Sequence, residues 1–419
     1  MSELLAGLRV IDAASFLAGP CATTILSDYG ADVIKIEPLT GDGHRRLSGS
    51  HPVDYTWQLT NRNKRSLALD FTREPGRGVL LRLLDGADVV LFNLRADQLQ
   101  RYELGFDTLQ RRNPRLIVAQ ISGYGLEGAE SARRAFDTTG WYARSGILDV
   151  MRDKDRPPAP PAGGVGDHAT AMTLFGAIML ALYRRQQTGT GGMVSTSLAA
   201  TGAWANGLQV QGMLAGFDAT ERRDQEGWSN PFSNVYRTRD GRHIMLALAS
   251  PEQEWPRLAT ALGHAEWSSD PRFTDMRSAL KHRHALRALI ADAFAMLDIT
   301  RADAVLKAHD LTFSVIARLD EVVADPQLIA NGLIVATDST EPGYERTLAT
   351  PFNLTGSPQR TPTRAPQLGE HSRAILAEAG LSDQEINALI DQGAVKAGQR
   401  TPVVTASSPT DPAGLQSAT

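Results

Sequence analysis

One short turn combines residues that could carry out acyl chemistry. Its sequence is Gly163-Gly164-Val165-Gly166-Asp167, and an apolar helix follows it. Glycines leave the backbone open to a close ligand, so their N–H groups could stabilise an oxyanion. A carboxylate beside them could act as a nucleophile toward an activated acyl carbon. The alternative is structural, because an aspartate at a helix start often only caps the free N–H groups.

The helix is predicted from apolar residues that recur at three- and four-residue spacing. Asp167 is expected just before its first turn. Because Arg184 and Arg185 bound the helix, we expect a buried core helix rather than a membrane span. The apolar positions are Ala171, Leu174, Ala177, Ile178, Ala181 and Leu182.

The composition is that of a soluble globular protein, and its 419 residues suffice for two or three domains. A formal net charge of -4, without a long basic run, argues against nucleic acid or an anionic membrane as partners. Cys21 is the single cysteine, which excludes an internal disulfide and a cysteine-rich zinc site, and no metal site is predicted. Together with an N-terminus unlike a signal sequence, it predicts a cytoplasmic protein.

Strands and helices alternate in the first half of the chain, which predicts a parallel sheet with helices on both faces. The opening βαβ unit has no G-x-G-x-x-G motif, so a dehydrogenase is not expected. Ligands of such sheets bind beyond the carboxyl ends of the strands, where Ser15, Asn93 and Ser122 fall. The expected strands are 7–12, 31–37, 87–93, 116–121 and 193–198, and the expected helices are 20–29, 75–84, 99–112 and one that reaches Leu214.

A basic turn with Arg62, Lys64 and Arg65 precedes a short strand that ends at Asp70. Such a cluster is ordinarily a solvated turn. It could instead bind the phosphate groups of a cofactor. The sequence leaves both interpretations open.

The composition changes after residue 218, and a hairpin around the Asp240-Gly241 turn opens a second unit. Helices at 251–262, 276–296 and 301–309 follow in this unit. The predicted parts are a large α/β domain (1–218), a linker (219–229), a small α+β domain (230–330), a return segment (331–398) and a disordered Pro-, Ser- and Thr-rich tail (399–419).

Taken together, these segments resemble the family III (CaiB/BaiF) CoA-transferases, the group of formyl-CoA transferase and carnitine CoA-transferase, over nearly the full length. The resemblance implies a Rossmann-like large domain beside a smaller domain. No single motif is decisive, but seven in the same order are specific. They are Gly7–Asp12, Ala18–Pro20, Gly30–Glu37, Asn61–Asp70, Gly166–Asp167, Thr188–Gly191 and Ala365–His371.

The resemblance implies a reaction at Asp167. In that family the matching aspartate attacks the acyl-CoA thioester, giving a mixed anhydride and then an aspartyl-CoA thioester, which an acceptor carboxylate attacks. Acyl-CoA and a small carboxylic acid are then substrates, and no permanently bound cofactor is expected.

The resemblance also assigns CoA contacts, position by position. They fall on Ala18, Leu69, Asn93, Arg101 and Arg134, the last in place of a lysine of formyl-CoA transferase.

Other positions depart from formyl-CoA transferase. Ser15 and Leu17 replace its histidine and glutamine, Phe136 replaces a tyrosine, and its tetraglycine loop is missing. Formate and oxalate are therefore not supported as the acid pair.

Two other functions remain open. The racemase branch of the superfamily pairs the aspartate with a histidine, since inversion needs a base on each face, but Phe136 stands at that place. A non-catalytic acyl-CoA-binding protein would gain nothing from a buried carboxylate at Asp167. His168 is expected to be a packing or helix-start residue, because an aspartate already ionised at pH 7 needs no base. Trp141 and Tyr142 are expected in the core, although an acid with apolar surface would suit them as a wall.

The order of the segments bears on assembly. The extended pieces at 333–337 and 348–354 are expected to be unable to form a sheet of their own, so they and the helices at 372–379 and 383–392 must pack on a large domain. In the family that the chain resembles, this return closes each chain into a ring. Two rings interlock as a homodimer, which we expect here.

Overall fold

The computed structural model describes residues 3–47, 49, 51–217 and 230–398, so the predicted linker and tail lie outside the described residues. Its largest sheet has the order β12-β3-β2-β1-β4-β5-β6. Six strands run parallel, and β12 pairs antiparallel with β3. The expected parallel sheet is therefore mixed. Its strands are β1 (Arg9–Asp12), β2 (Asp32–Glu37), β3 (Arg65–Leu69), β4 (Val89–Phe92), β5 (Ile117–Ser122), β6 (Gly192–Ser197) and β12 (Val395–Lys396).

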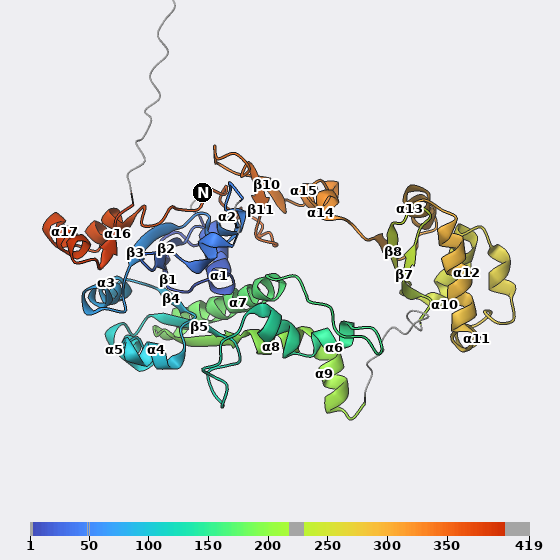
Figure 1. Ribbon diagram of the computed structural model, residues 1–419, viewed down its shortest axis with the longest axis horizontal. Coiled ribbons are helices and arrows are strands. Elements are labelled where there is room, and N and C mark those ends of the chain that lie inside the picture. The colour runs from blue at the N-terminus through green and yellow to red at the C-terminus, as the bar shows by residue number, and fades with distance from the viewer. Residues whose placement is uncertain (1–2, 48, 50, 218–229, 399–419) are drawn as a thin grey trace, which may run out of the picture.

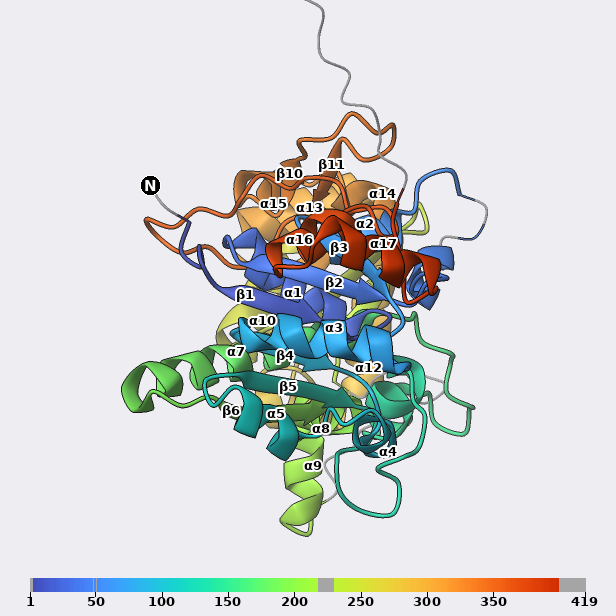
Figure 2. The ribbon, with the colours of Figure 1, turned by 90° about the vertical axis from the view of Figure 1, so that its left-hand side faces the viewer.

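Helices cover both faces of this sheet, as the alternation of buried side chains requires (Figure 1). In β4, Val89 and Leu91 belong to a core under α1 and α7. Val90 and Phe92 belong to a core under α3 and α5, which α16 and α17 extend (Figure 2). The helices of this domain are α1 (Ala18–Asp28), α2 (Tyr55–Asn61), α3 (Glu74–Asp85), α4 (Ala96–Arg101), α5 (Phe106–Arg112), α6 (Ile147–Met151), α7 (Val165–Thr188), α8 (Leu198–Ala205) and α9 (Gly207–Leu214), with a 3-10 turn η1 (Gly43–Arg46) and a π-helix η2 (Thr138–Ala143).

Some expected helices are interrupted. The helix predicted over 99–112 is divided into α4 and α5, because Glu103 takes a φ of 59° and ends the first of them. The helix predicted to reach Leu214 is divided at Asn206, between α8 and α9. Periodicity continues across both breaks, so it could not reveal them.

Helix α7 is long and apolar enough, by length and composition, to cross a membrane. It packs on α1 through Leu174 and Ile178, which are buried. The prediction of a buried core helix is confirmed for that face only, because Leu180 and Tyr183 are exposed.

The second unit has its own sheet and its own core. Strands β7 and β8 form the expected hairpin, and β9 pairs antiparallel with β8. Buried residues between Phe232 and Leu311 pack together around it. The helix predicted over 276–296 is divided at His282 into α11 and α12. The elements are β7 (Ser233–Arg237), β8 (His243–Ala247), α10 (Pro251–Ala261), the 3-10 turn η3 (Ala265–Ser269), α11 (Met276–Lys281), α12 (Arg283–Ala295), α13 (Ile299–Ala308) and β9 (Phe313–Val315).

The last part of the described chain returns to the large domain (Figure 1). Ile375, Ile386 and Val395 join the core under α3. The expectation that the extended pieces form no sheet of their own is wrong, because β10 and β11 pair with each other, antiparallel. The elements are α14 (Leu319–Val322), α15 (Pro326–Ala330), β10 (Ile334–Ala336), β11 (Arg346–Leu348), α16 (Ser372–Glu378) and α17 (Asp383–Asp391).

Candidate active site

A cavity of about 360 Å³ opens beyond the carboxyl ends of β1, β4 and β5. This is where ligands bind in sheets of this kind. Ser15, Asn93 and Ser122 line it, as expected for residues that follow these strands, and Asp167 reaches it from α7. The remaining lining comes from segments 16–19, 94–98, 120–126 and 131–136 and from Leu198.

Asp167 lies in the first turn of α7 rather than before it. Helix α7 begins at Val165, and its N-cap is Gly164, with a φ of 93°. Asp167 is therefore not the N-cap of this helix, and the purely structural interpretation of Asp167 as a cap is wrong. No hydrogen bond to the Asp167 carboxylate is found among the described residues, so this group is available to a ligand.

The two glycines nearest to Asp167 in the sequence, Gly164 and Gly166, are required for different reasons. Gly164 needs its left-handed conformation. A Cβ on Gly166 would lie 2.5 Å from Cγ of Trp141, so this position has no room for a side chain. Trp141 and Tyr142 are buried in a small cluster and do not line the cavity, so they are core residues, as expected.

Asp137 holds the turn and faces the nucleophile candidate. Its Oδ2 accepts a hydrogen bond of 2.6 Å from the backbone N–H of Gly164. Burial, and then the charge of Asp137, raise the pKa of Asp167 to about 7. The expectation that Asp167 is already ionised at pH 7 therefore holds for only part of the molecules. Sequence reasoning missed Asp137, which nothing but its position next to Phe136 would have indicated.

His168 turns toward α1 rather than toward the cavity. Its Nδ1 lies 3.2 Å from Sγ of Cys21. Burial, and then the charge of Arg62, lower the pKa of His168, so the ring is neutral at pH 7. A packing role, as expected, agrees with this contact.

The five predicted CoA contacts are not all together. Ala18, Asn93 and Arg134 line the cavity with Asp167. Leu69 ends β3, where it pairs with Val395 and its side chain is buried in the core. Arg101 ends α4 on the surface, outside the cavity lining. The CoA-binding roles of all five residues stay predictions.

The basic turn is neither solvated nor open to a phosphate. Lys64 is buried and donates to Asp12 Oδ2 at 3.0 Å. Arg62 pairs with Asp28, and Arg65 bridges to other elements. Both interpretations of the turn are therefore wrong, because each cation is engaged within the fold.

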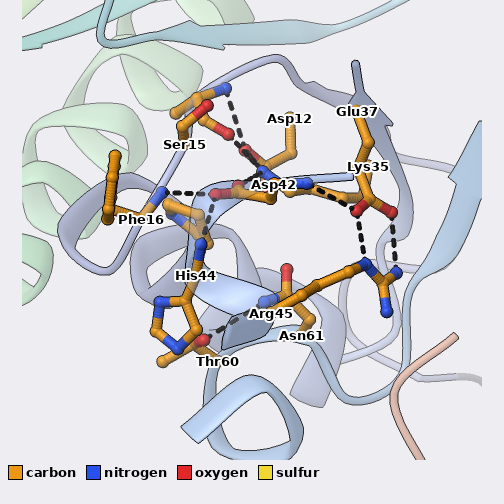
Figure 3. A network of polar contacts seen from close by, with 12 residues as sticks. Asp12, Ser15, Phe16, Lys35, Glu37, Asp42, His44, Arg45, Thr60 and Asn61 are labelled. Atoms are coloured by element: carbon orange, nitrogen blue, oxygen red, sulfur yellow. Dashed lines mark hydrogen bonds and ion pairs between the residues drawn. The ribbon is translucent and has the colours of Figure 1, made fainter. Parts of the chain in front are cut away.

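A second buried cation holds the loop that lines the cavity (Figure 3). Lys35, on β2, pairs with Asp42 Oδ2 at 3.0 Å and donates to the carbonyl of Ala14. Asp42 Oδ1 accepts from the backbone N–H of Phe16 at 3.1 Å. Opposite charges and these contacts raise the pKa of Lys35 against the effect of burial, so it stays charged. In the sequence, the only indication of this network is the charged Lys35 among the apolar residues in the middle of strand β2.

Asn93 fixes the same loop from the other side. Its Nδ2 donates to the carbonyl of Ser15 at 2.8 Å, and its Oδ1 accepts from the N–H of Ser15 at 3.0 Å. The loop after β1 is thus held by β4 and by the Lys35–Asp42 pair. A preorganised loop of this kind reduces the entropy cost of ligand binding.

The comparisons with known proteins agree on one family. Residues 5–372 match the model of CoA-transferase family III. The chain is 29% identical to an (R)-2-hydroxy-4-methylpentanoate CoA-transferase of Clostridioides difficile, with 94% of this chain and 100% of the relative covered. It is 28% identical to a formyl-CoA:oxalate CoA-transferase of Streptomyces coelicolor, with coverages of 94% and 100%.

A solved structure supports the fold. A crystal structure of a CaiB/BaiF family protein from Brucella suis superposes with a TM-score of 0.80 at 29% identity, covering 90% of this chain and 100% of that one. The chain therefore belongs to CoA-transferase family III. It is an enzyme of the CoA-transferase class, which moves CoA from an acyl-CoA to a carboxylate.

Proposed function

We propose that Asp167 is the nucleophile of this CoA transfer. Its carboxylate attacks the thioester carbon of the donor acyl-CoA, the C–S bond breaks, and a mixed anhydride and CoA thiolate result. The thiolate then attacks the aspartyl carbonyl, which frees the donor acid and leaves an aspartyl-CoA thioester. One observation carries the proposal: the Asp167 carboxylate lies in the cavity wall and has no hydrogen-bond partner among the described residues.

The second half of the reaction reverses these steps with a new acid. The acceptor carboxylate attacks the aspartyl-CoA carbonyl and expels the thiolate, which gives a second mixed anhydride. The thiolate attacks the acyl carbon of this anhydride, so the new acyl-CoA forms and the Asp167 carboxylate is restored. Atoms and charge balance, and no further cofactor is needed.

The first turn of α7 supports the transient oxyanion. The first N–H groups of a helix have no acceptor within the helix, and its dipole favours negative charge there. Gly164 and Asp137 shape this turn, and the free N–H groups next to Asp167 would stabilise the negative charge that develops on the reacting carbonyl.

Binding of CoA is assigned to residues near the nucleophile and farther away. Ala18, Asn93 and Arg134 would contact the thioester end, because they share the cavity with Asp167. The resemblance alone assigns CoA contacts to Arg101, at the nucleotide end, and to Leu69, which is buried in the single chain.

An intermediate-trapping experiment tests the proposal. Incubation with a donor acyl-CoA and hydroxylamine should convert Asp167 to a hydroxamate, which peptide mass spectrometry locates. Asp167→Ala should lose the adduct and the transfer activity. Asp107→Ala is the matched control, because Asp107 also lies in the first turn of a helix but outside the cavity. An adduct elsewhere, or transfer by a folded Asp167→Ala variant, would refute the nucleophile.

We further propose an interlocked homodimer in the cytoplasm. The support is an apolar surface on consecutive helices of one chain, where Tyr183, Trp204, Leu208 and Leu214 are exposed. The described chain returns from the small domain to the large one through α14 and α15 (Figure 1), as a chain that closes into a ring would do.

A further inference from the structure

Two aromatic rings face the same cavity and pack on each other. Phe16, in the loop after β1, and Phe136, before η2, have ring centroids 5.6 Å apart at an interplanar angle of 82°. Both line the cavity, and both are exposed, Phe16 to 38% and Phe136 to 60%. Each ring therefore keeps a free apolar surface, which distinguishes the pair from core aromatics.

The pair stands at the end of the cavity that holds the nucleophile. Leu17, next to Phe16, has Cδ1 3.8 Å from the Cβ position of Gly164. Asp137, next to Phe136, accepts the hydrogen bond from the N–H of Gly164. Each aromatic residue is thus one position away from a contact with the turn that carries Asp167. An acyl carbon at Asp167 would place the rest of the acyl group near the rings.

The position of the Phe16 ring is set by the surrounding structure. Phe16 has a φ of 65°, which costs energy for a bulky residue and persists only where neighbours enforce it. Its N–H is held by Asp42 (Figure 3). Its Cζ lies 3.2 Å from where Gly43 would carry a Cβ, so a side chain there would push the ring away. Phe136 is held by reciprocal hydrogen bonds of 3.0 Å with Thr139.

The charged residues around the cavity offer no free partner for the second carboxylate of a dicarboxylic acid substrate. Arg95 pairs with Asp97, and Arg133 pairs with Glu130. Among the described residues that line the cavity, Arg134 is the arginine without an ion pair, and CoA binding is assigned to it above. The other walls near the rings include Leu17 and Leu198, where a free carboxylate would lose its hydration without compensation.

We propose that Phe16 and Phe136 form the specificity-determining wall of the acyl site. The wall selects monocarboxylic acids that carry an aromatic or branched apolar group close to the carboxyl carbon, and their CoA thioesters. The inference rests on the proposed function of Asp167, because it places the acyl carbon there. An edge-to-face arrangement leaves room for a third ring against the same pair.

Substrate competition tests the wall. With acetyl-CoA as donor, the wild-type enzyme should use 3-phenylpropionate with a kcat/KM at least about tenfold above that for propionate or succinate. Phe136→Ala should lower the value for 3-phenylpropionate about tenfold and change that for propionate less than about threefold. Leu319→Ala, an exposed apolar residue outside the cavity, should change neither. A preference for succinate, or an equal loss for all acids in Phe136→Ala, would overturn the proposal.

A binding measurement separates this proposal from the role of Asp167. Titration calorimetry with 3-phenylpropionyl-CoA and propionyl-CoA can be performed on Asp167→Ala, which cannot turn over either one by the proposed route. The phenyl compound should bind about tenfold more tightly, and Phe136→Ala added to this background should remove the difference. Equal affinities would refute the wall. Transfer activity retained by Asp167→Ala would refute the nucleophile and leave the binding difference intact.

Discussion

The carboxylate of Asp137 is bonded to the N–H of Gly164, the N-cap of the helix that carries Asp167. One buried side chain therefore both fixes the turn that carries Asp167 and places a second negative charge beside this carboxylate. That charge adds to burial in raising the pKa of Asp167. A raised pKa makes a carboxylate a stronger nucleophile once it is ionised, at the cost of a smaller ionised fraction at neutral pH.

The pH dependence of the reaction should report this relationship. Because Asp167 must be ionised to attack, kcat/KM should rise with pH around the pKa of about 7 and level off above it. Asp137→Asn keeps a hydrogen-bond acceptor for Gly164 but removes the charge, so the midpoint should fall by roughly one unit. Asp107→Asn is the control and should leave it in place. An unchanged midpoint in Asp137→Asn would mean that burial alone sets the pKa.

The same shift predicts that the Asp167 carboxylate lowers the stability of the folded protein at neutral pH. A carboxyl group whose pKa is about 7 when folded and near 3.8 when unfolded holds its proton more tightly in the folded state. Stability is therefore lost as pH rises from about 4 to 7. Asp167→Asn removes the titration, so its free energy of unfolding should exceed that of the wild type by about 1–3 kcal/mol at pH 8, after allowance for solvent screening.

Urea unfolding at two pH values checks this prediction. The gain of Asp167→Asn should be present at pH 8 and absent near pH 4, where the wild-type carboxyl is also neutral in the folded state. A gain of equal size at both pH values would point to packing rather than to ionisation. A loss at pH 8 would contradict the raised pKa.

The sequence could indicate Asp167 as the candidate nucleophile because its signal is local. Three glycines beside Asp167 are unusual for a simple cap, and the family resemblance assigned the same residue. The network around it could not be predicted in this way. Lys35 pairs with Asp42, and Asp42 accepts a hydrogen bond from the N–H of Phe16. These contacts depend on the path that the chain takes after β2, which periodicity does not determine.

The burial of the basic turn also could not be predicted from local sequence. Lys64 and Asp12 are 52 positions apart, and the sheet brings them together in a buried pair. Charge in a polar turn usually means exposure, and only the parallel order of β1, β2 and β3 places this lysine inside. The break between α4 and α5 was missed because Glu103, not a glycine, adopts positive φ there.

The close packing under the nucleophile turn predicts a pair of glycine substitutions with opposite effects. Gly166→Ala would place a Cβ 2.5 Å from Trp141, so the first turn of α7 must shift. We expect a loss of about 1–3 kcal/mol of stability and at least a tenfold loss of kcat. Gly176→Ala, in the same helix with open space around it, should gain about 0.5–1 kcal/mol and keep full activity.

Thermal unfolding and initial rates distinguish the two variants. Equal stability of Gly166→Ala and Gly176→Ala would contradict the packing of Trp141 against this turn. If Gly166→Ala lost stability but kept its kcat, the position of the first turn would not matter for catalysis.

Two arginines test the predicted CoA contacts. Arg134 lines the cavity, whereas Arg101 is assigned by the resemblance alone. Arg134→Ala and Arg101→Ala should each raise the KM for acyl-CoA about ten- to hundredfold, because each would lose a charge-assisted hydrogen bond worth about 1.5–3 kcal/mol. Neither should alter which acids are accepted. Arg111→Ala, on the exposed surface of α5, is the control. An altered choice of acids in Arg101→Ala would show that this residue lies near the acyl group instead.

The exposed apolar helices lead to the last prediction, which concerns assembly. Trp204 and Leu208 are each exposed to 86% in the single chain, and α9 has no buried residue. Covering such a surface is strongly favourable, at about 25 cal/mol per Å² of apolar area. If two closed chains interlock as well, neither can leave the other without unfolding, so dissociation is governed by a slow rate rather than by mass action. We expect a species of about twice 45.3 kDa that persists at nanomolar concentration for days.

Mass photometry after prolonged dilution measures this directly, and Trp204→Ser should lower the yield of assembled enzyme without making the assembled dimer dissociate. A folded, active monomer at such dilution would exclude interlocking, whereas a dimer that dissociates reversibly would keep the apolar interface and reject the closed ring.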